Sequence, residues 1–383
     1  MIYLDHNATT PPAPEVVKAV ANCMTEVWAN ASSQHGPGQA AKQRLAQARA
    51  AVARFLGCRP TELVFTSGAT EANHMAVHGA LARSRRRRLL VSAVEHAGLR
   101  QIALQLPDVQ VDWMPVHASG ELNRDATCAL MRDDLALVSL MAANNETGVL
   151  MPVTELAALA HAHGTLLHVD ATQWIGKLGF DFSTCGADLV SVSAHKFNGP
   201  KGVGALIVRQ GLAWPAWMVG SQERGRRGGT ENLPAIAGFA AAAELLMTGP
   251  ALHERAAHTA RLRDLLEQGL TRALPGTVVY GATQPRLPNT ICLRFGMLPA
   301  ELVLNRLEGL GVMASSGSAC ASAGSEPSHV LTAMGASRDE ALCAVRLSLD
   351  CTTTEAELRR VLEALPAELG PLMREAQAVA EPA

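Results

Sequence analysis

Runs of apolar residues alternate with amphipathic stretches over the first two hundred positions of the chain. Strand-like apolar runs occur at 62–67, 88–94, 109–116, 135–142, 165–171, 189–194 and 204–209. Helical periodicity is clearest at 14–28, 38–57, 70–83 and 153–163. A strand that is buried on both faces is apolar along its whole length, and helices between such strands cover the two faces. The pattern therefore predicts an α/β fold with a mostly parallel, seven-stranded sheet.

The pattern changes in the last third of the chain. A long helical stretch at 251–273 precedes short strand-like runs, and another helix is expected at 299–310. We interpret residues 14–255 as a large domain. Residues 1–13 together with 256–383 are expected to form a smaller α+β domain.

Composition and charge exclude several classes of protein. The 383 residues are 48% hydrophobic but only 4% aromatic, and the formal net charge is -2. These values argue against a general binder of nucleic acid or of membrane surfaces. The first residues resemble no signal peptide, and no apolar run is long enough to cross a membrane. Eight scattered cysteines without a CxxC pair favour reduced thiols in a cytoplasmic protein over a zinc site.

An arginine-rich run, RSRRRR at 83–88, is the most strongly charged stretch of the chain. It follows a predicted helix and precedes a predicted strand, so we expect a solvated surface turn. A docking patch for an acidic partner at Arg85–Arg88 is the alternative.

Polar residues follow five of the predicted strands. The carboxyl ends of parallel strands meet at one edge of a sheet, so these side chains are expected to point into one crevice. The polar strand ends supply Ser67, Gly68, Ala69, Thr70, Glu95, His96, Asn144, Asn145, Asp170, Gln173, Ser193, His195 and Lys196.

Three features of this set indicate a cofactor. The turn before Thr70 opens a helix, whose free N–H groups suit a phosphate, although an ordinary helix cap explains the motif equally well. Lys196 is one of only five lysines beside 28 arginines, and lysine, unlike arginine, can form a Schiff base. Taken alone, it is more simply a surface lysine at a strand end. Asp170 ends a buried strand and can pair with a protonated ring nitrogen. Together these groups favour pyridoxal phosphate.

Two neighbouring side chains complete the predicted ring environment. Gln173 is expected to hydrogen-bond the phenolic oxygen of the ring. His96 is expected to stack on the ring and to move protons, since the pKa of histidine lies near neutrality.

Two residues of the smaller domain are candidates for substrate chemistry. Residues 314–330 are rich in Ala, Ser and Gly, bury little apolar surface and are expected to form a mobile loop. Cys320 lies in this loop, where a thiolate can approach a bound amino acid and attack its sulfur or selenium atom. Arg346 lies inside an apolar run and is the candidate for binding the substrate carboxylate.

The chain resembles the cysteine desulfurases of the class-V aminotransferase family. The resemblance covers nearly the whole length and rests on ordered motifs: YLDHNATTPP, FTSGATEAN, NNETGV, HVDATQWIGK, SVSAHKFNGPKGVGAL, QERGRRGGTEN, SSGSACASAGSEPSHVL and VRLSL. The SSGSAC and RRGGTEN stretches resemble the branch that serves iron–sulfur cluster assembly and nitrogen fixation.

The resemblance implies an aminotransferase fold of type I and roles for individual residues. Lys196 would hold pyridoxal phosphate covalently, Asp170 would pair with the ring nitrogen, and His96 would act on the ring and on protons. Gln173 and Asn145 would lie near the phenolic oxygen or the substrate. The phosphate would be bound by Ala69, Thr70, Ser193 and His195, with Thr230 reaching the phosphate in the neighbouring subunit.

The resemblance also implies the reaction and the partners. L-Cysteine would become L-alanine, with its carboxylate on Arg346 beside Asn145, and Cys320 would carry the sulfur as a persulfide. A homodimer would pass that sulfur to an acceptor such as an iron–sulfur scaffold. No metal site is expected, apart from a transient contact of an iron–sulfur cluster with Cys320.

Three departures from the family pattern and three competing functions remain. The start reads DHNATT, and Asn30 lacks the usual following proline, so no role is assigned to Asn30. Ala194 stands where glycine is usual, so the phosphate turn is expected to differ slightly. Selenocysteine lyase and a plain class-V aminotransferase are the enzymatic alternatives, and the latter gives Cys320 no role. A catalytically inactive sulfur carrier is the alternative from another class.

Overall fold

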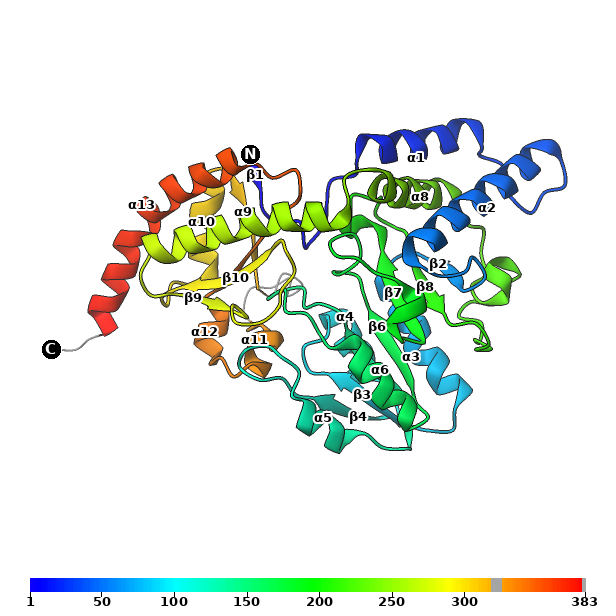
Figure 1. Ribbon diagram of the computed structural model, residues 1–383, viewed down its shortest axis with the longest axis horizontal. Coiled ribbons are helices and arrows are strands. Elements are labelled where there is room, and N and C mark those ends of the chain that lie inside the picture. The colour runs from blue at the N-terminus through cyan, green and yellow to red at the C-terminus, as the bar shows by residue number, and fades with distance from the viewer. Residues whose placement is uncertain (318–325, 381–383) are drawn as a thin grey trace.

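A seven-stranded sheet forms the larger part of the molecule in the computed structural model, which describes residues 1–317 and 326–380 (Figure 1). Its strand order is β2-β8-β7-β6-β5-β3-β4, and β8 alone runs antiparallel to its neighbours. The strands are β2 (Leu63–Thr66), β3 (Arg88–Ser92), β4 (Gln110–Met114), β5 (Leu135–Met141), β6 (Leu166–Asp170), β7 (Leu189–Ser193) and β8 (Gly204–Val208). The predicted mostly parallel sheet of seven strands is confirmed, and each strand lies within its predicted run.

Helices cover both faces of this sheet. One face, with Val64, Leu137 and Leu206, packs against α3 and α4, while the other, with Phe65, Val138 and Ile207, packs against the remaining helices. Residues of both faces are buried, which explains why the strands read as continuous apolar runs. The helices of this part are α1 (Pro14–Glu26), α2 (Gly36–Leu56), α3 (Ala69–Arg83), α4 (Ala97–Gln105), α5 (Arg124–Leu130), α6 (Val153–Ala162), α7 (Phe182–Cys185) and α8 (Leu233–Thr248).

The smaller part is built on a four-stranded antiparallel sheet of order β12-β13-β10-β9. Its strands are β9 (Thr277–Tyr280), β10 (Thr290–Phe295), β12 (Ser315–Ser316) and β13 (Ala344–Ser348). Its helices are α9 (Leu252–Ala273), α10 (Ala300–Gly309), α11 (His329–Ala333), α12 (Arg338–Leu342) and α13 (Glu355–Ala380). Figure 1 shows α9 running from the larger part along the smaller one. The division into domains at residue 255 stays a prediction.

The N-terminal segment belongs to the core of the smaller part. Strand β1 (Ile2–Tyr3) pairs in parallel with β11 (Val312–Met313), and Leu4 is fully buried in the same apolar cluster as β10 and β13. The chain then crosses to the larger part, where Thr10 donates a backbone hydrogen bond to His195. Residues 5–10 therefore lie between the two sheets.

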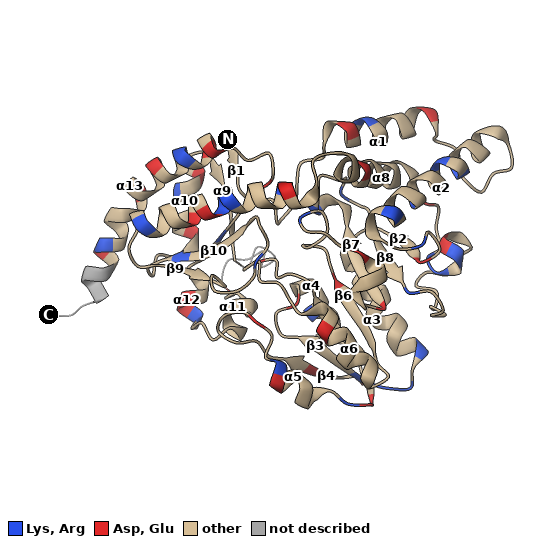
Figure 2. Ribbon diagram, in the orientation of Figure 1, with Lys and Arg blue, Asp and Glu red and all other residues tan. Residues whose placement is uncertain are grey.

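Charged residues of both signs are distributed over the surface, and both signs alternate on α9 and α13 (Figure 2). The arginine run forms a turn between α3 and β3, as expected. Arg86 donates to the Leu135 and Gly164 carbonyls. Arg87 donates to the carbonyls of Leu81 at the end of α3 and of Ser84, and Arg88 pairs with Asp112. These contacts give Arg86, Arg87 and Arg88 a local structural role, while Arg85 and Arg87 remain exposed, so the alternative of a docking patch stays open.

Among the described residues, no single helix is long and apolar enough to cross a membrane, and the α8–α9 pair that reaches the length is bent by 87°.

Candidate active site

A cavity of about 580 Å³ opens at the carboxyl ends of the strands of the large sheet. The N-terminal residues Ala8 and Thr9 form part of its wall. Nine predicted site residues line it: Ala69, Thr70, His96, Asn145, Asp170, Gln173, Ser193, His195 and Lys196. The structure therefore brings together side chains that lie up to 127 positions apart, because parallel strands end at a common edge.

Asp170 is the buried carboxylate of this cavity. It ends β6 and is only 6% exposed. Asn73, one turn into α3, donates a hydrogen bond to Oδ2 at 2.9 Å, and the Thr172 amide donates to Oδ1 at 3.0 Å. A buried carboxylate with two donors is held in one orientation. Asn73 was missed in the sequence, although its place in FTSGATEAN was the available signal.

Lys196 follows β7 in a short 3-10 turn, Ala194–Lys196. Its Nζ donates to the carbonyl oxygens of Asn7 at 2.7 Å and Ala8 at 2.9 Å. Ala194 is fully buried and has no positive φ, so the alanine at this position fits the turn with ordinary backbone angles. The amine is thus held between two carbonyls at the cavity wall.

The first turn of α3 offers an anion site. Gly68 precedes the helix and makes no side-chain cap, so the first N–H groups of α3 have no side-chain acceptor within the described ranges. Those groups lie at the positive end of the helix dipole and suit a phosphate. The Ser193 Oγ lies close by, 3.7 Å from where a Cβ on Gly68 would stand.

Both site histidines make hydrogen bonds at the cavity. Burial, reinforced by the Lys196 and Lys201 cations, lowers the pKa of His195 to about 4, and its Nδ1 lies 3.1 Å from the Thr9 hydroxyl. His96 caps α4, because its Nδ1 accepts from the Gly98 amide at 3.1 Å. An accepting Nδ1 leaves the ring proton on Nε2.

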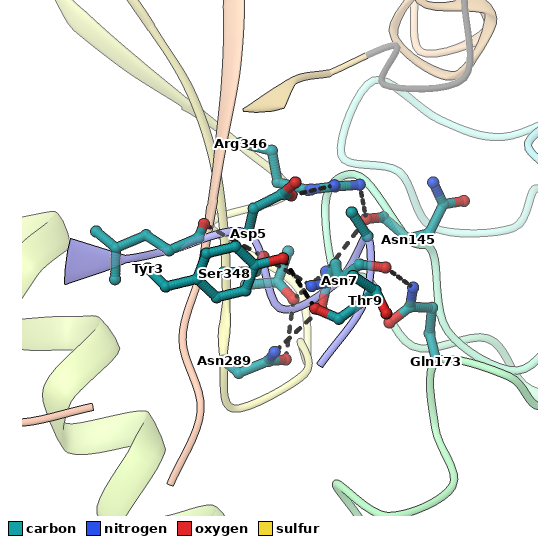
Figure 3. A network of polar contacts seen from close by, with 12 residues as sticks. Tyr3, Asp5, Asn7, Thr9, Asn145, Gln173, Asn289, Arg346 and Ser348 are labelled. Carbon is teal, nitrogen blue, oxygen red and sulfur yellow. Dashed lines mark hydrogen bonds and ion pairs between the residues drawn. The ribbon is translucent and has the colours of Figure 1, made fainter. Parts of the chain in front are cut away.

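Arg346 lies behind the cavity wall in β13 and is 2% exposed. Its Nη2 donates to the Asp5 carboxylate at 2.8 Å, and its Nη1 donates to the Asn145 carbonyl at 3.0 Å (Figure 3). Its Nε is buried and has no partner within the described part of the chain. The arginine is therefore pinned on two sides and keeps one buried donor for a ligand.

Besides Arg346, two further predicted residues are not placed in the cavity. Thr230 is exposed and lines two separate hollows of about 230 and 330 Å³, the second shared with Asn30 and Trp28. Its role toward a neighbouring subunit stays a prediction. Cys320 lies outside the described residues.

Asn7 and Lys177 are polar residues that sequence reasoning missed, although YLDHNATT and QWIGK contain them. Lys177 is partly buried, and it donates to Asn7 Oδ1 at 2.7 Å and to Gln173 Oε1. Burial lowers the pKa of Lys177 well below its usual value, and the nearby Lys196 and Arg346 cations lower it further. Seen alone, these residues resemble ordinary core polar groups, and only the fold places them beside the cavity.

The cavity fits pyridoxal phosphate. Three buried polar atoms on its wall, Asn73 Oδ1, Asn145 Oδ1 and Thr172 Oγ1, have no partner among the described residues. Buried polar groups are almost always satisfied, so a polar ligand is expected against them. The volume lies in the usual range for cofactor sites, and the donor set contains an amine, a buried carboxylate and an uncapped helix N-terminus. Among the described residues, no cluster of His, Cys, Asp or Glu could hold a metal ion.

Comparison with known proteins gives a consistent result along the whole chain. The model of the family "Aminotransferase class-V" matches residues 2–361. A cysteine desulfurase of Cereibacter sphaeroides is 44% identical over 371 residues, which cover 95% of each chain. One of Rhodobacter capsulatus is 46% identical over 380 residues, covering 97% of this chain and 98% of the relative.

Solved structures agree with the sequence relatives. A NifS-like protein superposes with a TM-score of 0.88 at 34% identity and covers 96% of this chain and 99% of its own. The structure of SspA in complex with cysteine superposes with a TM-score of 0.81 at 30% identity, over 92% of this chain and all of the other.

Proposed function

The chain belongs to the class-V aminotransferase family and is a pyridoxal-phosphate-dependent cysteine desulfurase, and from this premise we propose how its own residues divide the reaction. The cavity at the carboxyl edge of the large sheet, with its amine, carboxylate and uncapped helix N-terminus, is the observation that carries the assignment.

The cofactor is held by three groups. The phosphate is bound by the first turn of α3 at Ala69 and Thr70, with Ser193 and the neutral His195 as hydrogen-bond partners. Asp170, fixed by Asn73, keeps the ring nitrogen protonated, and Lys196 provides the amine that binds the aldehyde.

Further residues surround the ring. His96 would lie against the ring, and Gln173 and Asn145 would be the partners of its polar edge, since all three residues line the cavity. When bound, pyridoxal phosphate accepts electrons from the substrate carbon that has lost a proton.

The substrate is L-cysteine, as in the SspA structure with cysteine. Arg346 binds its carboxylate through the unpartnered Nε and the remaining Nη hydrogens, while Asp5 and the Asn145 carbonyl hold the guanidinium still. The Lys196 amine takes the proton from the α-carbon, and His96 moves protons at the sulfur side. An arginine with two contacts already made loses little freedom when the substrate arrives.

Cys320 receives the sulfur. The substrate C–S bond breaks, an S–S bond forms at Cys320, and a proton is placed on the carbon that becomes the methyl group of L-alanine. One cysteine and one protein thiol thus give one alanine and one persulfide, and no external oxidant or reductant is needed.

The decisive experiment tests the role of Lys196 in cofactor attachment separately from the role of Cys320 in sulfur transfer. Borohydride reduction of the holoenzyme followed by peptide mass spectrometry is expected to find the cofactor on Lys196. Cys320→Ala is expected to keep the yellow cofactor absorption but to form no alanine and to gain no sulfur by intact mass. Cys128→Ala, which removes an exposed free thiol on α5, is the matched control and keeps full activity. Normal turnover by Cys320→Ala would refute the assignment.

The partners of the enzyme complete the proposal. A homodimer, in which Thr230 reaches the phosphate of the neighbouring subunit, is supported by the exposed position of this residue. The sulfur acceptor is proposed to be an iron–sulfur scaffold, with transient contact through Cys320. A cytoplasmic setting is supported by the seven cysteines of the described residues, all of which are free.

A further inference from the structure

Asn7 makes hydrogen bonds to several polar groups of the site, and none of the roles described above accounts for them. It is 1% exposed and follows the short β1 strand. Its amide Nδ2 donates to the Asn145 carbonyl at 3.2 Å and to the Thr290 hydroxyl at 2.9 Å. Its Oδ1 accepts from Lys177 Nζ at 2.7 Å and from Asn289 Nδ2 at 3.0 Å. Figure 3 shows this network between the two sheets.

The side-chain amide of Asn7 is fully used. An asparagine amide has two hydrogens and two oxygen lone pairs, and each of the four has a partner here. The orientation of the amide is determined, because the Asn145 carbonyl can only accept and must face the nitrogen. The backbone N–H donates to the Ser348 hydroxyl at 2.9 Å. The position of the Asn7 peptide is therefore fixed from both parts of the molecule.

The backbone oxygen of Asn7 is the point where this network meets the reaction. It accepts from Lys196 Nζ at 2.7 Å and from Gln173 Nε2 at 2.9 Å, and the Ala8 carbonyl accepts from the same amine at 2.9 Å. Carbonyl oxygens stabilise the protonated form of an amine, because they accept hydrogen bonds and carry partial negative charge.

We propose that Asn7 is a positioning residue that holds its own carbonyl, together with that of Ala8, as the resting place of the protonated Lys196 amine. In the reaction the amine must be released, take the α-proton of the substrate and return that proton. Because the Asn7 and Ala8 carbonyls are both fixed and both accept from Lys196 Nζ, the ammonium has one defined position at the cavity wall. This inference rests on the proposed role of Lys196.

The same network relates the amine to the substrate arginine. The Asn145 carbonyl accepts from both Asn7 Nδ2 and Arg346 Nη1. Asn7 thereby fixes the position of the Lys196 amine relative to the Arg346 guanidinium, although Lys196 and Arg346 come from different sheets. A change at Asn7 is expected to disturb proton transfer more than cofactor binding.

The test compares Asn7→Ala and Asn7→Asp with Tyr3→Phe. Tyr3 donates to the Thr9 carbonyl at 3.0 Å, so Tyr3→Phe loosens the same segment without touching Lys196. In the Asn7 variants kcat is expected to fall about tenfold to a hundredfold, since a general base displaced by about 1 Å loses that much. KM for cysteine is expected to change less than threefold. Tyr3→Phe is expected to keep kcat within about twofold of the wild type.

A second readout does not use the loaded enzyme. In the cofactor-free full-length protein, the rate of Lys196 acetylation by acetic anhydride at one fixed pH reports how firmly the amine is held as an ammonium. Asn7→Ala is expected to react severalfold faster, and Tyr3→Phe at the wild-type rate. Equal acetylation rates and equal kcat in all four proteins would overturn the inference, because Asn7 would then be structural only. If borohydride trapping labels Lys196 in that case, the proposed function survives; if it labels another residue, the proposed function itself has failed.

Discussion

The Arg346 guanidinium donates a 2.8 Å hydrogen bond to the carboxylate of Asp5, 341 positions earlier in the chain. The Arg346 side chain of this pair is only 2% exposed and is therefore nearly excluded from water. A buried arginine needs a partner before the substrate arrives, and Asp5 is that partner.

Arg346→Lys is therefore expected to impair substrate binding. A lysine cannot reproduce the planar fork that contacts Asp5, the Asn145 carbonyl and a carboxylate together. We expect KM for cysteine to rise about tenfold to a hundredfold, as for loss of a hydrogen bond between charged groups. Steady-state alanine formation measures it.

Arg294→Lys is the matched control for this prediction. Arg294 lies on β10 of the same sheet and pairs with Glu340 at 2.9 Å, but within the described part of the chain no hydrogen bond connects it to Asp5 or Asn145. If both variants raise KM equally, the effect comes from the small sheet as a whole and not from contact with the substrate.

Asp170→Asn is expected to lower turnover strongly while leaving the fold intact. The amide keeps the shape of the side chain but cannot hold a proton on the cofactor ring by charge. Loss of one well-placed electrostatic partner costs about a hundredfold to a thousandfold in kcat. Asn73→Ala, which removes the donor to Oδ2, is expected to give a smaller loss of the same kind. A wild-type rate in Asp170→Asn would show that another group protonates the ring.

Much of the fold and of the site can be predicted from sequence, for a physical reason. Strands buried on both faces give continuous apolar runs, and their carboxyl ends carry the polar residues of one crevice, so the positions of Asp170 and Lys196 follow from local patterns. Asn73 sits one turn inside a helix, and its contact with Asp170 depends on how the helix packs.

The N-terminal residues show where sequence reasoning ends. Asp5 and Asn7 contact residues that lie 138 to 341 positions away. Such contacts are fixed by the packing of two sheets and leave no local periodicity. Motif resemblance identifies YLDHNATT as part of the pattern but does not say which atoms its residues contact.

Gly204→Ala is expected to weaken cofactor binding without contacting the cofactor. A Cβ on Gly204 would stand 2.7 Å from Gly68 Cα and 2.5 Å from the Val192 carbonyl, both backbone atoms. The turn that begins α3 must then shift, and with it the N–H groups that bind the phosphate. We expect the dissociation constant of pyridoxal phosphate to rise about tenfold, measured by absorption titration, as for loss of one hydrogen bond to a charged group. Gly202→Ser is no substitute for this test, because Gly202 has a positive φ of 79° and is strained by any side chain. Unchanged affinity in Gly204→Ala would place the phosphate elsewhere.

Glu146→Gln is expected to be more stable than the wild type at neutral pH, and this advantage is expected to shrink at acid pH. Burial raises the pKa of Glu146 to about 7, although the Ser328 hydrogen bond and the Arg346 cation oppose the shift. The native state therefore binds more protons than the unfolded chain, and stability falls as pH rises from about 4.5 to about 7. A shift of this size corresponds to about 3 kcal/mol. The difference in Tm between Glu146→Gln and wild type should grow with pH across this window; a constant difference would contradict it.

His168 changes the stability of the protein in nearly the same pH window as Glu146, but its contribution decreases as pH falls. Its two ring nitrogens lie 2.9 Å from the Ser139 and Ser191 hydroxyls, and burial lowers its pKa to about 4 while Asp170 opposes the shift. The folded protein resists protonation of this ring, so its contribution to stability is lost as pH falls from about 6.5 to about 4. His168→Gln is expected to be less stable than the wild type at pH 7, because one serine loses its partner.

The pH dependence of Tm distinguishes an effect of His168 protonation from an effect of local packing alone. Between pH 6.5 and 4.5 the wild type loses the stability that neutral His168 provides, whereas His168→Gln has no group to protonate there. The Tm of the variant should therefore approach that of the wild type as pH falls, while Glu146→Gln loses its advantage over the same range. Since the two groups oppose each other, the double variant should show a pH profile close to that of the wild type but shifted in Tm. Parallel Tm curves for His168→Gln and the wild type would mean that folding does not lower the pKa of His168, which would contradict the effect of burial described above.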